Sequence, residues 1–137
     1  GQPASVDDYL DQLIEQELLY AEAQRRGLDP SESEVTQLAK ATKVGLEGLL
    51  AEDSALAADL RNVFAQVQGT PYHVDVYDTS PVMLDSFRRQ LAINSLREQV
   101  LADLSPADRS DSAKREARID QFVADLRRGA DIKIGAN

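Results

Sequence analysis

The sequence has no cysteine, no tryptophan and a single histidine. The absence of cysteine excludes disulfides, thiol nucleophiles and thiolate metal sites, and it leaves the redox compartment undetermined. Aromatic residues make up only 5% of the chain, so a core of aliphatic side chains on packed helices is favoured. The sequence also has no apolar run long enough to span a bilayer, and it shows no signal-peptide pattern.

Basic residues are scarce relative to acidic ones. The chain has 15 Lys and Arg against 24 Asp and Glu, a net charge of −9. Residues 1–69 hold 5 basic and 13 acidic groups and residues 70–137 hold 10 and 11, so the halves carry −8 and −1. An acidic chain repels phosphate backbones and anionic lipid surfaces, so neither nucleic acid nor a membrane is an expected partner. A basic polypeptide segment would be attracted, although a charged surface that only keeps a protein soluble is far more common.

The length of 137 residues predicts one domain, and helical periodicity runs through most of it. We expect a first helix over residues 6–26 with Ser5 as its cap, and a second helix that Gly45 and Gly48 interrupt. Further helices are predicted over residues 55–68, over residues 81–104 after the Ser80 cap, and from about residue 114 to a stop at Gly129, with a polar loop or frayed turn over residues 105–113.

Residues 10–35 contain the clearest helix signals. Gly27 and Pro30 end the first helix, and Ser31 with Glu34 forms a capping-box pattern that begins the next. The apolar residues of the first helix recur at the spacing of one helical face, which indicates a core-packing surface; they are Leu10, Leu13, Ile14, Leu18 and Ala21. The helices that carry Phe87 and Phe122 are expected to pack on this stretch.

Two segments have a strand pattern. Val74 and Val76 alternate with polar residues inside residues 70–80, which predicts an extended loop or a short strand. Ile132 and Ile134 alternate with polar residues near the C-terminus, which predicts a short strand that needs a pairing partner.

Signals for catalysis are weak. His73 with Asp75 and Asp78 has the residue types of a metal site, although an ordinary loop histidine is favoured. No Gly-x-Ser-x-Gly elbow frames a nucleophile, and the glycines form neither a phosphate-binding loop nor a dinucleotide fingerprint. We therefore predict no enzyme activity, no catalytic residue, no metal site and no cofactor.

One group of side chains suits adaptable apolar binding. Aromatic and methionine side chains gather near the irregular segment and would adapt to varied partners at little entropic cost; they are Tyr72, Tyr77, Met83 and Phe87. Packing in the core is the favoured alternative for these residues. Arg88, Arg89 and Arg97, on the helix that carries Phe87, form either a solvated face or one wall of a cleft.

Three segments resemble a known family. QLIEQELLYAEAQRRGLDPSESEV (residues 12–35) closely resembles the N-terminal helical domain of SurA-type periplasmic chaperones. SFRRQLAINSLREQVL (residues 86–101) resembles the helix that closes that domain, and IDQFVADLRRGADIKI (residues 119–134) resembles its returning C-terminal helix and strand. The family's parvulin isomerase domains have no counterpart here, and one histidine without cysteine does not supply the paired histidines of their site.

The resemblance implies a fold and a function. The expected fold is all-α: one orthogonally packed domain over residues 1–137, with about five helices and a short C-terminal β-strand, in which residues 114–134 return to complete the domain. The implied function is chaperone-like binding of unfolded or extended client polypeptides in a cleft between helices, outside the cytoplasm and without isomerase activity. The alternative is an assembly module that homodimerises by strand or helix exchange, or docks to a partner through its helices and unpaired terminal strand.

Overall fold

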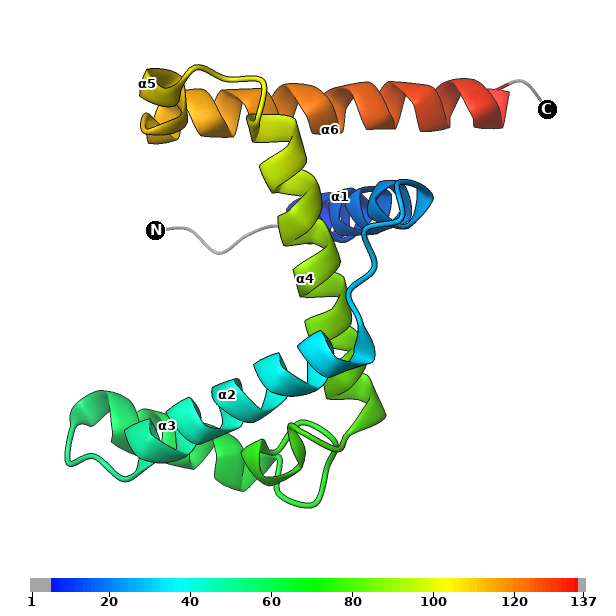
Figure 1. Cartoon of the computed structure of the whole chain (residues 1–137). Helices are drawn as coiled ribbons and strands as arrows, with labels where there is room; N and C mark the ends of the chain where they lie inside the picture. The colour runs from blue at the N-terminus through cyan, green and yellow to red at the C-terminus, as the bar shows by residue number, and fades with distance from the viewer. Residues whose placement is uncertain (1–5, 136–137) are drawn as a thin grey trace. The chain divides into compact units, whose positions relative to one another are not determined.

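Helices are the regular secondary structure in the described part of the chain. The computed structural model describes residues 6–135, with side chains described for residues 6–130. Within that range no strand occurs, which confirms the all-α prediction. The helices, coloured by residue number in Figure 1, are α1 (Val6–Arg25), α2 (Glu32–Leu50), α3 (Ala55–Gln66), the 3₁₀ helix η1 (Val74–Val76), α4 (Pro81–Leu101), α5 (Pro106–Arg109) and α6 (Ser112–Gly135).

The chain divides into two compact units. Unit 1 contains the described residues up to Asp29 and from Ala92 onward, and unit 2 contains Pro30–Leu91. The first half of α4 belongs to unit 2 and its second half to unit 1. Each unit has its own buried cluster of apolar side chains. The extent of a single domain over residues 1–137 stays a prediction.

The core of unit 1 joins segments that are far apart in the sequence. Ala23 of α1 and Ala92 and Leu96 of α4 have no exposed surface. Small alanine side chains let helix backbones approach closely. Phe122 of α6 packs against this cluster, as expected. The remaining members are Leu19, Tyr20, Ile93, Val100 and Val123, with Leu28, Ile119 and Leu126 at the margin.

The buried face of α1 is not the one that we predicted. Leu10, Leu13 and Ile14 remain 49%, 46% and 47% exposed. The buried residues of α1 all lie in its C-terminal half and are Leu19, Tyr20 and Ala23. The expectation that the first half of α1 packs into the core is therefore wrong. Periodicity reports that a helix has an apolar face, but only tertiary packing decides which part of that face is covered.

Glycine ends helices here only where its backbone turns left-handed. Gly27 and Gly69 have φ values of 72° and 79°, and the preceding helices stop as predicted. Gly45 and Gly48 lie inside an unbroken α2, and α6 continues through Gly129, so the interruption and the stop predicted there are wrong. A glycine in a helix interior costs about 1 kcal/mol, which packing elsewhere along the helix offsets.

Several predicted element ends shift. The fourth helix ends at Leu101 rather than near Leu104, and the polar segment after it contains the short α5, capped by Ser105. The predicted C-terminal strand is not confirmed, because the chain is helical as far as Gly135. The predicted Ser5 cap lies outside the described residues.

Unit 2 is built from α2, α3, η1 and the first half of α4. The predicted capping box is confirmed: the Glu34 N–H donates to Ser31 Oγ at 3.1 Å, and the Glu34 carboxylate accepts from the Ser31 N–H at 3.5 Å. Phe87 packs against Val35 and Ala39 of α2. Arg88 also reaches α2, where it donates to the Glu32 carboxylate at 3.0 Å.

The segment predicted to be a loop or short strand forms η1 instead of a strand. The Tyr77 N–H donates to the Val74 carbonyl at 3.2 Å, and His73 caps the turn. These local hydrogen bonds satisfy backbone groups that a lone strand would leave unpaired. In the described range, no helix is both long and apolar enough to cross a bilayer.

A charged cluster stabilises the end of α1. Glu22 accepts hydrogen bonds from Arg25 at 2.6 Å and from Arg26 at 2.8 Å, and its side chain is only 11% exposed. These hydrogen bonds, that from Arg25 foremost, lower the pKa of Glu22 from 4.5 to about 2. Both arginines also lie near the negative end of the helix dipole, and Arg26 stacks over the Phe122 ring at 5.3 Å.

We expect Glu22→Gln to lower the free energy of unfolding by about 1 kcal/mol at pH 7, since Arg25 is largely exposed and the pairing is screened by water. The folded pKa lies below the unfolded one, so the stabilisation is complete above pH 4.5 and is lost as the pH falls toward 2. Urea unfolding of both proteins across this range should show the difference shrinking. A difference that is constant with pH would contradict this assignment, and Glu98→Gln, at an exposed position of α4, is the control.

Candidate functional site

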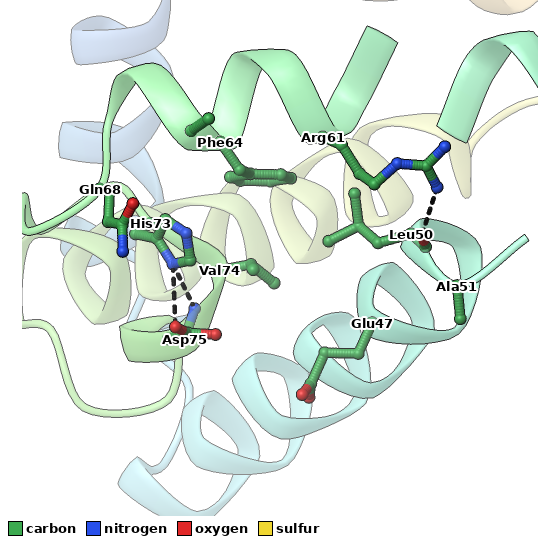
Figure 2. A pocket seen from close by; sticks show the side chains of 10 residues that line it. Glu47, Leu50, Ala51, Arg61, Phe64, Gln68, His73, Val74 and Asp75 are labelled. Carbon is green, nitrogen blue, oxygen red and sulfur yellow. Dashed lines mark hydrogen bonds and ion pairs between the residues drawn. The ribbon is translucent and has the colours of Figure 1, made fainter. Parts of the chain in front are cut away.

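A concave site lies within unit 2. A pocket of about 450 Å³ opens between the C-terminal half of α2, helix α3 and η1. Figure 2 shows its lining, which mixes apolar and polar side chains: Glu47, Leu50, Ala51, Arg61, Phe64, Ala65, Gln68, His73, Val74 and Asp75. Phe64 and Val74 are buried, whereas the charged residues are more exposed. An apolar floor with polar groups at the rim is the usual composition of a ligand pocket.

Arg61 fixes one wall of the pocket. Its Nη1 donates to the Leu50 carbonyl at 2.7 Å (Figure 2). It also donates to the Glu52 carbonyl at 3.1 Å, so Arg61 ties α3 to the end of α2 and to the loop that follows. The last carbonyls of a helix have no partner within the helix, and a guanidinium there satisfies them and complements the helix dipole. Arg61 is therefore a structural member of the pocket as well as a lining residue.

His73 lies at the opposite end of the pocket lining. Its Nδ1 accepts a hydrogen bond from the Asp75 N–H at 3.1 Å, which leaves Nε2 as the protonated nitrogen of the neutral ring. The Asp75 carboxylate lies 3.4 Å from the same nitrogen. The imidazole also meets the Phe64 ring edge to face, with centroids 5.8 Å apart. The histidine ring is thus held in one orientation by the turn that it caps.

The three residues that have the types of a metal site, His73, Asp75 and Asp78, do not form one cluster. Asp78 pairs with Lys43 of α2 at 3.4 Å, while His73 interacts with Asp75. Among the described residues, no group of three or more histidine, aspartate or glutamate side chains could hold a metal ion. The lining residues of the pocket likewise include no serine, threonine, lysine or tyrosine that His73 could activate as a nucleophile.

The four side chains that the sequence grouped as peptide-binding are divided by the structure. Phe87 is only 6% exposed, and Met83 and Tyr77 pack around it beside α2. Tyr72 is 54% exposed and does not line the pocket. The structure therefore brings three of the four residues together, in the core of unit 2.

A row of aromatic rings connects that core to the pocket. Tyr77 meets Phe87 edge to face at 6.1 Å and Phe64 at 6.0 Å, and Phe64 in turn meets His73. Each such contact contributes about 0.5–1.5 kcal/mol beyond burial. Partial burial also raises the pKa of the Tyr77 phenol above its ordinary value. Tyr77 therefore supports the pocket from behind through Phe64.

Most pocket residues were not predicted from the sequence. Phe64 and Gln68 are four residues apart and close to the irregular segment, a spacing that signals a shared helical face. Glu47 and Leu50 carried no such signal, because only the packing of α2 on α3 brings them to the site.

We expect Arg61→Ala to lower the free energy of unfolding by about 1 kcal/mol, because the Leu50 carbonyl at the end of α2 and the Glu52 carbonyl in the following loop lose a charged donor. Arg61→Lys should recover part of this loss, since an ammonium keeps the charge but lacks the planar fork. Urea unfolding measures both values. Asn62→Ala, at the neighbouring exposed position of α3, is the control, and an equal effect of the two alanine variants would contradict the role of Arg61.

Comparison of the chain with models of known families, with curated proteins and with solved structures finds no match. The resemblance to SurA-type chaperones therefore stays a prediction from the three matching segments.

Proposed function

We propose that the protein binds extended or unfolded polypeptide segments non-covalently, in the manner of a chaperone, and that the pocket of unit 2 is the contact site. The observation that carries this proposal is the composition of the pocket: a floor of Phe64, Val74 and Leu50 below a rim of hydrogen-bonding side chains. An apolar side chain of a client would enter the floor, and its backbone amides would meet the rim.

The polar rim suits a backbone better than one particular side chain. Arg61 and Gln68 supply donors, and Glu47 and Asp75 supply carboxylate acceptors. Every residue of a bound peptide presents the same N–H and C=O groups, so such a rim recognises clients of many sequences. An open apolar floor discriminates poorly between side chains, since one methylene changes affinity by about 1–3 kcal/mol.

The resemblance to SurA-type chaperones supports the same function and adds three elements to the proposal. These elements are a location outside the cytoplasm, orthogonal packing of the helices, and a C-terminal strand that forms when it pairs with another chain. Isomerase activity is not part of the proposal, because the chain has one histidine and no cysteine.

The test fills the pocket without touching the core. Ala65 is exposed and lines the pocket, so Ala65→Trp should weaken the binding of fluorescent peptides from an unfolded secreted protein at least fivefold. The same variant should be less able to suppress aggregation of that protein. Fluorescence anisotropy and light scattering measure the two effects.

Ala58→Trp is the matched control, because Ala58 is an exposed position of the same helix outside the pocket. Tyr72→Ala tests the exposed aromatic residue that the sequence singled out. If the unmodified protein binds no peptide and does not suppress aggregation, the chaperone function fails. If both tryptophan variants behave alike, the pocket is not the site.

One observation favours a second function, assembly with a partner or with a second copy. Apolar side chains in the first half of α1 remain about half exposed, although they form a continuous face. Exposed apolar faces of this kind mark interaction surfaces in soluble proteins.

A further inference from the structure

The exposed apolar face of α1, here the α1 stripe, consists of five side chains. Leu10, Leu13 and Ile14 are nearly half exposed, and Val6 and Tyr9 are 74% and 60% exposed. Positions separated by three and four residues lie on one side of a helix, so these five side chains form a single row. The row extends over eight residue steps, about 12 Å along the helix axis.

The α1 stripe has an acidic border. Residues 6–17 include five acidic side chains and no basic one; the acidic residues are Asp7, Asp8, Asp11, Glu15 and Glu17. Asp7, Asp11 and Glu15 follow one another at four-residue spacing, which places them along one edge of the row. Arg127 of α6 interacts with Asp11 at 3.2 Å and with Glu15 at 3.8 Å, so one cation already lies at this edge.

The negative charge of this border indicates which kind of partner could dock on the α1 stripe. A second copy of the chain would bring the acidic edge of Asp7, Asp11 and Glu15 against an identical edge, and like charges across an interface oppose docking. A partner with lysine or arginine beside its own apolar residues would be attracted. The contact between Arg127 and this same edge shows the geometry that such a cation would use.

The spacing of the side chains in the α1 stripe indicates the secondary structure of the partner. Apolar side chains at intervals of three and four residues match a second helix, whose side chains pack between them as in a coiled coil. An extended strand presents its side chains at a period of two residues and matches this row poorly.

We infer that the α1 stripe is a docking surface for a basic amphipathic helix of about three turns. The partner presents an apolar face to Leu10, Leu13 and Ile14, and its lysine or arginine residues meet the acidic border. This inference names the occupant for the assembly function; it does not rest on client binding in the pocket of unit 2.

The test uses a synthetic peptide of about 14 residues, with leucines at positions i, i+3, i+4 and i+7 and lysines on the flanks. A second peptide has glutamate in place of every lysine. Fluorescence anisotropy at low salt should show binding of the lysine peptide and at least tenfold weaker binding of the glutamate peptide. The affinity for the lysine peptide should fall as salt screens the charges.

The double variant Leu10→Gln/Leu13→Gln separates this docking from general attraction to an acidic protein, because it keeps every charge. We expect it to bind the lysine peptide at least tenfold more weakly. Asp7→Asn should weaken binding two- to threefold and reduce the salt dependence. Leu56→Gln/Val63→Gln, at exposed positions of α3, should change nothing.

The absence of cysteine permits a direct check of access to the surface. A single cysteine at Leu10 or Ile14 should react with a maleimide as fast as one at the exposed Leu56, and the lysine peptide should slow it. A rate as slow as that of a cysteine at the buried Val100 would overturn the proposal.

The remaining outcomes separate this inference from the assembly function. If the double variant binds the lysine peptide as tightly as the unmodified protein, the α1 stripe is not the docking surface. If the protein forms a dimer that the double variant abolishes, assembly stands and the occupant is a second copy. If it binds neither peptide and remains monomeric by light scattering, both proposals fail.

Discussion

Unit 1 depends on one buried cluster of apolar side chains to which α1, α4 and α6 all contribute. Ala23, Ala92 and Leu96 have no exposed surface, and around them α1, α4 and α6 contribute the rest of the cluster. Ala23 and Ala92 are completely buried in this cluster. A larger side chain at either position would overpack the core and destabilise unit 1. The buried residues of α1 all lie in its C-terminal half, whereas apolar side chains of its N-terminal half are about half exposed.

The burial of the C-terminal half of α1 also explains why Glu22 is paired with two arginines. Glu22 lies one position before Ala23 and is mostly covered, so its carboxylate needs strong donors, which Arg25 and Arg26 provide. Arg26 then extends to Gln99 of α4 at 3.2 Å and to the Phe122 ring of α6. Helix capping, ion pairing and core packing in this unit thus converge on residues 22–26.

Local signals in the sequence predicted much of the fold. Capping at Ser31, the stop at Gly27 and the start of α4 at Pro81 all depend on neighbouring residues, and all three were predicted. The errors concern features that distant segments decide. Gly129 has the residue type of a helix stop but not the left-handed backbone, and Leu10 has the right spacing for a core residue but remains 49% exposed.

The candidate site was less predictable than the fold. The sequence located the irregular segment and its aromatic residues, and the structure places Tyr77 directly behind the pocket wall at Phe64. Arg61 and Leu50 could not be assigned to the site, because their positions follow from the packing of α3 against the end of α2. Aromatic content identified the region, whereas tertiary contacts decide which side chains face a ligand.

The C-terminal half of α1 is anchored in the core of unit 1, and we infer that its exposed N-terminal half docks a partner. Hydrogen exchange of the backbone amides tests it most directly, since protection reports local opening. The account predicts that amides of residues 19–23 exchange at least 100-fold more slowly than those of residues 10–14, and that the lysine peptide slows only the second group. Equal protection of the two groups, unchanged by the peptide, would contradict it.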